Sequence, residues 1–586
     1  MTEKKEMYSI NMKMRSVRLF ASMLVLTLML SLSIFDSVVY GQTNFPVMVE
    51  VEADKTISEL RPIWNYFGYD EALTTLTPEG EHLLKELKKM SAPEPIQIRV
   101  HHLLTSGDGT LALKWSSTNV YTEDENGNPV YDWTMMDKIM DALTEPGIEP
   151  FVQASFMPKD LSSKPEPYTP ALVQRGRPEN MVEGGAFYPP KDYKKWEMLI
   201  EEWVRHSAER YGEERASSWL WEPWNEPESP YWRGTPEEFF KLYDHFAAAV
   251  KRVLPNARVG GPHVTGPGWK NGDVFMRAFL EHCRNGTNAA TGEIGTPLDF
   301  IAFHAKGTTR IDEQGRVEMN LQNQLETIQI YSEIISGYPE FADLPVYIGE
   351  SDPEGCAGCP ATEDPERGYR LTSQFASYTA ASFMRKQDLM ARYDLDLQGA
   401  VSWAFTFHDQ PWFNGLRALT TNKVALPVFN AFKLFSKLDR QRIEVSVPSA
   451  PYDTDKIIEE GVRGVYGDVN AVATKGENHI QVLLWHYHDV AGDGPLANVT
   501  LRLNGLPGEE KIQIEELRID EDHGNAYAAW LGMESPQEPT PEQVDALHAA
   551  SEIGEIRHED QSVTNGSTSM EISLPRQSVA LVTFSW

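Results

Sequence analysis

The most informative stretch of the chain is SSWLWEPWNEP, residues 217–227. Its apolar part has the composition of a buried strand, and it closes on an Asn-Glu-Pro turn that contains Glu226. A second strand-like run, LPVYIGE at residues 344–350, ends on Glu350. In a parallel barrel of alternating strands and helices, residues that close a strand at its C-terminal end project into the barrel mouth. The two glutamates are therefore expected to face one cavity, although an isolated turn of this kind is typical of a surface corner.

Strand and helix signals alternate from about residue 60 to 440, as a parallel sheet with crossover helices requires. Eight strands are predicted, at residues 63–68, 96–101, 150–155, 218–224, 258–262, 300–304, 346–350 and 400–405. Apolar residues spaced three or four apart predict helices at 82–90, 133–143, 192–211, 236–254, 273–284, 321–336, 368–393 and 428–438. This pattern predicts an α/β fold, a (β/α)8 TIM barrel over residues 42–440.

After about residue 440 the pattern changes to short runs that often alternate between apolar and polar residues. These runs lie at residues 464–466, 480–485, 499–503, 512–519, 570–574 and 578–584, separated by Gly, Asp, Asn and Pro. They predict a β-sandwich over residues 441–586, interrupted by a helix at about 541–550. Residues 47–57, within the segment 42–60, are a candidate further strand of this sandwich.

The first 41 residues have the pattern of an export signal. Lys13, Arg15 and Arg18 precede an apolar run at residues 19–35, and small residues follow at a suitable distance for cleavage. The alternative is an uncleaved signal anchor, because the run is close to the lower limit for spanning a bilayer. A periplasmic or secreted protein is expected.

The 586-residue chain carries a formal charge of −33. This acidity argues against nucleic acid and anionic membrane surfaces as partners, because both attract positive patches. It also disfavours a strongly anionic polymer as the main ligand, unless a local basic pocket binds it. A homo-oligomer remains a candidate, since nothing in the sequence sets the number of subunits.

Three cysteines are few for an exported protein of this size, so disulfides are not expected to hold the fold. Cys356 and Cys359 form a C-x-x-C directly after Glu350. Redox catalysis needs such a pair at a helix start, whereas this segment has the composition of a loop. A local disulfide or two free thiols is the preferred interpretation, and Cys283 is expected in the core.

Glycoside hydrolysis requires two carboxyl groups, one to protonate the leaving oxygen and one to act on the sugar carbon. Glu226 lies among Trp221, Trp224 and Pro227, and an apolar setting raises the pKa of a carboxyl group, so Glu226 is the candidate acid/base. Glu350 is the candidate nucleophile. The distance between the carboxyls distinguishes a retaining from an inverting mechanism, and the sequence does not give that distance.

Other polar or aromatic residues at predicted strand ends are candidates for binding sugar. Asn225 is placed to bond the hydroxyl beside the anomeric carbon, and His101 and His304 to orient hydroxyls or the nucleophile. Trp403 is a candidate platform for a sugar face. A structural role is the alternative for each of them. No metal site is expected, because His101 and His102 are neighbours on a strand and point to opposite faces.

The chain resembles glycoside hydrolase family 39, which contains β-xylosidases and α-L-iduronidases. The matching segments are residues 99–104, 156–158, 224–227, 260–262, 303–305, 348–350 and 523–530. The resemblance implies a barrel with a β-sandwich, retention of configuration, Glu226 as acid/base and Glu350 as nucleophile. It also implies that His101, Asn225, His304 and Trp403 line the sugar subsite, and it implies no cofactor.

The chain departs from the family pattern at His102, at Ser351-Asp352 after the predicted nucleophile, and at Phe407. These departures concern the rim of the pocket, where one hydroxyl contact can determine specificity. The sequence predicts an exported retaining exo-glycosidase, a β-xylosidase acting on short oligosaccharides. An α-L-iduronidase-like enzyme is the near alternative, which a basic residue in the pocket would favour. A non-catalytic carbohydrate-binding barrel and a thiol oxidoreductase are the alternatives from other classes.

Overall fold

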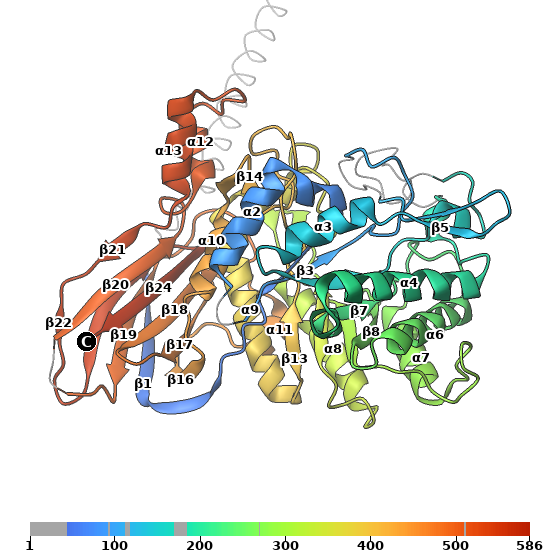
Figure 1. Cartoon of the computed structure of the whole chain (residues 1–586). Coiled ribbons are helices and arrows are strands. Elements are labelled where there is room, and N and C mark those ends of the chain that lie inside the picture. The colour runs from blue at the N-terminus through green and yellow to red at the C-terminus, as the bar shows by residue number, and fades with distance from the viewer. Residues whose placement is uncertain (1–43, 92–93, 112–117, 169–183, 269, 509–510) are drawn as a thin grey trace, which may run out of the picture. The chain divides into compact units, whose positions relative to one another are not determined.

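The computed structural model describes residues 44–586, except for 92–93, 112–117, 169–183, 269 and 509–510 (Figure 1). The predicted export signal, residues 1–41, lies outside the described residues. Among the described residues, none of the helices has the length and apolar composition needed to cross a bilayer.

Eight parallel strands form a barrel, in the order β13-β12-β9-β8-β7-β6-β3-β2. They are β2 (Tyr66–Tyr69), β3 (Gln97–Val100), β6 (Glu149–Gln153), β7 (Leu220–Glu222), β8 (Arg258–Val264), β9 (Phe300–His304), β12 (Val346–Glu350) and β13 (Leu397–Ala400). The residues after β13 close the barrel, because the Ser402 N–H donates to the Tyr66 carbonyl at 2.9 Å and Phe67 bridges Ser402 in parallel. The predicted (β/α)8 barrel is confirmed.

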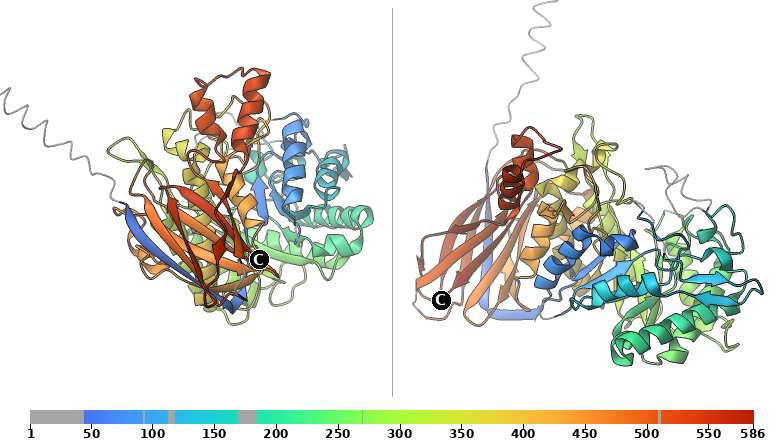
Figure 2. Two further views of the ribbon diagram at one scale, coloured as in Figure 1. Left: turned by 90° about the vertical axis from the view of Figure 1, so that its left-hand side faces the viewer. Right: turned by 45° about the horizontal axis from the view of Figure 1, so that its top comes forward.

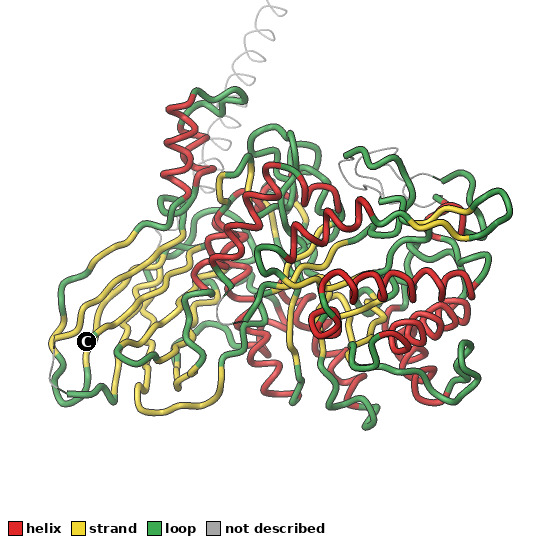
Figure 3. Tube along the Cα trace, viewed as in Figure 1, coloured by secondary structure: helices red, strands yellow, loops and turns green. Residues whose placement is uncertain are grey.

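Helices, red in Figure 3, lie between these strands along the chain, where the spacing of apolar residues predicted them. They are α2 (Pro78–Lys89), α3 (Thr134–Thr144), α4 (Tyr193–Tyr211), α5 (Glu213–Ser218), α6 (Pro236–Val253), α7 (Gly272–Asn285), α8 (Leu321–Ser336), α9 (Ser373–Tyr393) and α10 (Pro427–Phe435). Local signals explain several helix starts. In α6, for example, Thr235 and Glu238 form a capping box and Pro236 occupies the first helical position.

The last barrel strand differs from its prediction, which extended to Phe405. Regular pairing ends at Ala400, and the Trp403 N–H donates to Asp352 Oδ1 at 2.9 Å instead of to a neighbouring strand. Helix α5 likewise takes the first residue of the predicted strand 218–224, so β7 begins at Leu220.

The second sheet is mostly antiparallel, in the order β21-β20-β24-β18-β17-β16-β1-β19-β23 (Figure 2). Its strands are β1 (Phe45–Glu59), β16 (Gln441–Ser446), β17 (Asp468–Lys475), β18 (His479–Tyr487), β19 (Ala497–Asn504), β20 (Lys511–Ile519), β21 (Glu555–Arg557), β22 (Gln561–Ser562), β23 (Thr568–Leu574) and β24 (Ser578–Ser585). Residues alternate between buried and exposed along β23, as a sandwich layer with one solvated face requires. The early strand β1 lies between β16 and β19.

One predicted strand of the sandwich, residues 464–466, is wrong. This segment bends, and the Gly464 N–H donates to the Tyr452 hydroxyl at 2.8 Å. Val465 is 65% exposed, so its apolar side chain is not part of a buried face. The strand begins at Asp468 instead.

The remaining elements are short or inserted. Helices α12 (Ala526–Gly532) and α13 (Pro541–Ser551) form a helical hairpin within the sandwich sequence, and α13 coincides with the predicted insertion. Two-strand ribbons are β4 (Tyr121–Glu123) with β5 (Pro129–Tyr131), β10 (Arg310–Ile311) with β11 (Val317–Glu318), and β14 (Thr420–Thr421) with β15 (Val424–Ala425). Helix α11 (Thr454–Glu460) precedes β17.

Candidate active site

The two glutamates predicted to share a cavity lie side by side. Glu226 follows β7 and Glu350 ends β12, and they are 8% and 4% exposed. A carboxylate oxygen of each and a ring nitrogen of His304 all lie within 4.8 Å of one another. Strands far apart in the sequence therefore bring both carboxyls and one imidazole to a single point at the barrel mouth.

Glu226 is held in a strained backbone conformation at this point. Its φ is +45°, in the left-handed region that a residue with a Cβ seldom adopts. The Glu226 N–H donates to the His263 carbonyl at 3.1 Å, and His304 Nδ1 lies 2.9 Å from Glu226 Oε1. Burial raises the pKa of Glu226 to about 7, and the charge of Glu350 adds to this while Lys306 opposes it. Glu226 therefore carries its proton at pH values below about 7.

Glu350 has the opposite electrostatic setting. Burial acts to raise its pKa, but nearby cationic groups outweigh burial and hold the pKa well below the usual range. Lys306 Nζ forms a short ion pair with Glu350 Oε2, and Arg99 Nη1 lies 3.7 Å from Oε1. Glu350 is therefore ionised. The two neighbouring carboxyls, with oxygens within 4.8 Å of each other, thus differ in pKa, which suits an acid and a nucleophile.

Arg99, on β3, donates hydrogen bonds to residues of three other barrel segments at the site. Its Nε donates to Glu222 Oε1 at 2.7 Å, its Nη1 to the Gly349 carbonyl at 3.3 Å and its Nη2 to Asn225 Oδ1 at 3.0 Å. The Arg99 side chain is fully buried. Because the Asn225 oxygen is already bound, the amide NH2 of Asn225 is oriented as the group that can donate to a ligand.

His101 and Trp403 form the neighbouring wall. His101 Nδ1 lies 2.8 Å from Asp70 Oδ1, and His101 Nε2 lies 3.9 Å from Glu350 Oε1. The ring of His101 lies 4.2 Å from that of Trp403, centroid to centroid. Burial lowers the pKa of His101 and, more strongly, that of His304, so both imidazoles are neutral at neutral pH.

The structure therefore brings all six predicted site residues together, and their individual roles remain predictions. Trp403 is only 2% exposed, with Arg99 5.2 Å from its ring, so most of its surface packs against protein. His304 is bonded to the predicted acid Glu226 and lies 3.8 Å from the predicted nucleophile. Glu226, His304 and Glu350 also have the spacing of a cation site, but Lys306 already supplies positive charge to Glu350.

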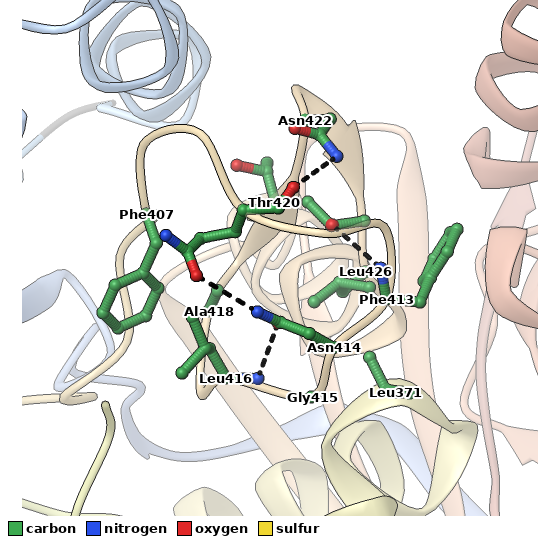
Figure 4. A pocket seen from close by; sticks show the side chains of 12 residues that line it. Leu371, Phe407, Phe413, Asn414, Gly415, Leu416, Ala418, Thr420, Asn422 and Leu426 are labelled. Carbon is green, nitrogen blue, oxygen red and sulfur yellow. Dashed lines mark hydrogen bonds between the residues drawn. The ribbon is translucent and has the colours of Figure 1, made fainter. Parts of the chain in front are cut away.

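A small pocket lies in the long loop that follows Trp403 (Figure 4). Its lining includes Phe407, Gln410, Phe413, Asn414 and Thr421. The polar groups bond one another across it, since Asn414 Nδ2 donates to Gln410 Oε1 at 3.4 Å and the Phe413 N–H to Thr421 Oγ1 at 3.4 Å. None of the six predicted site residues, all within the described ranges, lines this pocket.

Comparison with known proteins agrees with this geometry. The family described as Glycosyl hydrolases family 39 matches residues 47–556. The chain belongs to glycosyl hydrolases family 39. A β-xylosidase of Caldicellulosiruptor saccharolyticus is 26% identical over 548 residues, which cover 91% of this chain and 98% of that protein. An α-L-iduronidase of Canis lupus familiaris is 24% identical over 557 residues, covering 90% of this chain and 77% of that protein.

A solved structure shows the same fold. A monomeric β-xylosidase from Caulobacter crescentus CB15 superposes with a TM-score of 0.69 at 20% identity, covering 92% of this chain and 99% of that one. The predicted family is thus confirmed, and the protein is a family 39 glycoside hydrolase that acts on an oligosaccharide.

Several residues of this family 39 site were not predicted from the sequence. Lys306 stands two residues after His304 in the loop that follows β9, and Asp70 directly follows β2. Position after a strand end was a usable signal for both. Arg99 and Glu222 lie within β3 and β7, where the sequence does not reveal which side chains point up the barrel axis.

The C-x-x-C segment after Glu350 is a disulfide, Cys356–Cys359. Arg370 binds the loop from below, with Nη1 donating to the Cys359 carbonyl at 2.6 Å and Nη2 to the Cys356 carbonyl at 3.0 Å. The sequence left open a local disulfide or two free thiols, and the structure has the disulfide. Cys283 is a buried free thiol, as expected.

Proposed function

We propose that this family 39 enzyme is a retaining exo-glycosidase whose substrates are short β-xylosides. The observation that carries the proposal is the proximity of Glu226, whose pKa is raised, and Glu350, whose pKa is lowered, with a carboxylate oxygen of each within 4.8 Å of the other. Retaining glycosidases hold their carboxyls about 5 Å apart, whereas inverting enzymes leave a larger gap for water.

The two carboxyls support a double displacement. Glu350 attacks the anomeric carbon while Glu226 gives its proton to the leaving oxygen, so the glycosidic bond breaks and a glycosyl ester forms. Glu226, now ionised, takes a proton from water, and the water oxygen attacks the anomeric carbon and releases Glu350. The Asn225 amide is oriented to donate to the hydroxyl beside the anomeric carbon during both steps.

The choice of xylosides draws support from the curated relatives, since β-xylosidases match this chain over nearly their full length. A second candidate is a glycoside of a uronic acid, as in the α-L-iduronidases. The observation that favours it is Lys306, whose ammonium group forms an ion pair with Glu350 beside the predicted acid. A uronate carboxylate bound there would find a partner of opposite charge.

A panel of 4-nitrophenyl glycosides followed by NMR tests both candidates. Release of β-xylose from the β-xyloside as the first product supports the primary proposal, and preferred turnover of the α-L-iduronide supports the second. An initial product of inverted configuration would overturn the double displacement. Sugar binding without turnover of any glycoside would show a non-catalytic barrel.

We also propose export of this enzyme, on the pattern of residues 1–41. Expression of the whole chain in a bacterium, followed by N-terminal sequencing of the protein outside the cytoplasm, tests it. A product that stays in the cytoplasm and retains the first 41 residues would contradict export.

A further inference from the structure

A buried polar cluster lies behind the two loops that carry Lys306 and Glu350. Gln324, on α8, is fully buried, and its Nε2 donates to the Ala305 carbonyl at 2.8 Å, to Ser351 Oγ at 3.4 Å and to the Asp352 carbonyl at 3.4 Å. Ala305 immediately precedes Lys306, and Ser351 immediately follows Glu350. One side-chain amide therefore connects the backbone beside the predicted nucleophile to the backbone beside its cationic partner.

Helix α9 supplies only donors to the other end of this amide. Gln324 Oε1 accepts from Ser382 Oγ at 2.6 Å, from the Tyr378 hydroxyl at 3.1 Å and from Lys386 Nζ at 3.5 Å. Lys386 is fully buried and also donates to Ser382 Oγ through a short bond. A lysine ammonium has three donors and no acceptor, so it can face the oxygen of an amide but not its NH2.

The direction of the amide is what matters for the active site. If the Gln324 amide turned over, its oxygen would face the carbonyls of Ala305 and Asp352, and two acceptors cannot bond each other. Lys386 prevents this reversal because its ammonium would then face the amide NH2. Neither Lys386 nor Gln324 takes part in the proposed acid/base chemistry. A reversed amide would leave buried polar groups without hydrogen bonds, which costs folding free energy because water does not reach them.

We infer that Lys386 and Gln324 are positioning residues for the nucleophile, with Lys386 fixing the direction of the Gln324 amide and Gln324 holding the Lys306 and Glu350 loops in register. The inference rests on the proposed role of Glu350. Asn323, the neighbour of Gln324 on α8, adds to this arrangement by donating to the Lys306 carbonyl at 2.7 Å. Small misplacements of a reacting group can cost about 100-fold in rate, so the loops need such support.

The test measures kcat and KM on the preferred aryl glycoside for Lys386→Met, Gln324→Leu and the double variant. Assays at pH 6 keep Lys386 charged in the wild type, because burial lowers its pKa to about 7. Each single variant is expected to lose about 10- to 100-fold in kcat with KM within about threefold. Because Lys386 acts through Gln324, the double variant should lose no more than the worse single variant.

Two further variants keep the result interpretable. Tyr378→Phe removes one donor to Gln324 and leaves the Lys386 ammonium its bond to Ser382 Oγ, so it should lower kcat about threefold to tenfold even if Lys386→Met fails to fold. Lys433→Met is the matched control, since Lys433 on α10 lies 4.8 Å from the Phe429 ring much as Lys386 lies 4.6 Å from the Phe383 ring. It should keep the wild-type kcat.

The outcomes separate this inference from the proposed function. Wild-type kcat in Tyr378→Phe and in folded Lys386→Met, or losses that multiply in the double variant, would overturn the positioning role while an inactive Glu350→Ala still supports the nucleophile. Wild-type activity in Glu350→Ala would overturn the proposed nucleophile and with it the inference.

Discussion

Identical side chains acquire different chemistry in this site because their surroundings differ. Burial dominates for Glu226 and raises its pKa to about 7, whereas positive charge dominates for Glu350 and lowers its pKa. Only the protonated form of Glu226 can act as acid, so kcat/KM should fall as pH rises through about 7. A pH profile from 4 to 9 on a fixed substrate checks this, and a rate that stays level to pH 9 would contradict it.

The roles of the two carboxyls also predict different responses to substitution. Glu350→Ala should remove turnover of every glycoside, because no glycosyl ester can form. Glu226→Gln should lose about 100- to 10,000-fold on substrates with poor leaving groups, and much less where the leaving group needs no proton. Steady-state rates on 2,4-dinitrophenyl and methyl glycosides measure the contrast. Equal losses on both substrates would argue against Glu226 as the acid.

Lys306 permits a residue-scale test of substrate class. In Lys306→Met, Glu350 loses the strongest of the charges that lower its pKa, so the acidic limb of the pH profile should move upward on any substrate. If the substrate is a uronide, kcat/KM should in addition fall about 30-fold or more at the optimal pH, because a buried charge loses its partner. The measurement is the pH profile on xyloside and uronide in parallel. An unchanged acidic limb would show that Lys306 does not support the charge of Glu350.

The sequence predicted the site residues whose position at a strand end also determines that their side chains point into the barrel mouth. Glu226 and Glu350 close strands, so their meeting at the barrel mouth follows from the topology. Arg99 was not predicted as a site residue, because its contacts with Glu222 and Asn225 depend on how β3 and β7 pack in the folded barrel. The protonation states also depend on burial and on Lys306, which only the folded chain brings into place.

At the scale of elements, helices were predicted well because their signals are local. The bounds of α8 match the prediction, and those of α6 differ by one residue. Strand ends were less predictable, because they depend on partners elsewhere, as with the bond from Trp403 to Asp352 that ends β13. Strand β17, DVNAVATK, lacks a clear apolar run, and pairing with β16 and β18 defines it.

The disulfide loop after β12 gives a prediction for this scale. A crosslink between residues only three apart constrains the unfolded chain by about 2 kcal/mol, so Cys356→Ser/Cys359→Ser should lose about that much unfolding free energy. Chemical denaturation with and without a dithiol reductant measures it. Reductant should lower the stability of the wild type to that of the double variant and leave the variant unchanged. A reductant effect on the variant would point to another cause.

Over the whole molecule, barrel and sandwich share polar as well as apolar contacts. Residues 46–586 form one compact unit, in which α9 packs against β18 and β24. Arg385 on α9 forms a buried ion pair with Asp468, the first residue of β17, at 2.5 Å between Nη2 and Oδ1. Trp485 Nε1 donates to the same carboxylate at 2.9 Å. The predicted boundary near residue 440 falls in the short link between α10 and β16.

This buried pair should make the two parts unfold together. Asp468→Asn leaves the Arg385 charge buried and poorly paired, so the free energy of unfolding should fall by about 3–5 kcal/mol. The matched control is Asp455→Asn, which breaks the more exposed pair between Arg392 and Asp455 and should cost less than about 1 kcal/mol. Equilibrium denaturation followed by tryptophan fluorescence and by far-UV circular dichroism measures both. In the wild type the fluorescence and circular dichroism signals should coincide in one transition. Two separate wild-type transitions would show that this pair does not couple barrel and sandwich. Equal losses of unfolding free energy in the two variants would show the same.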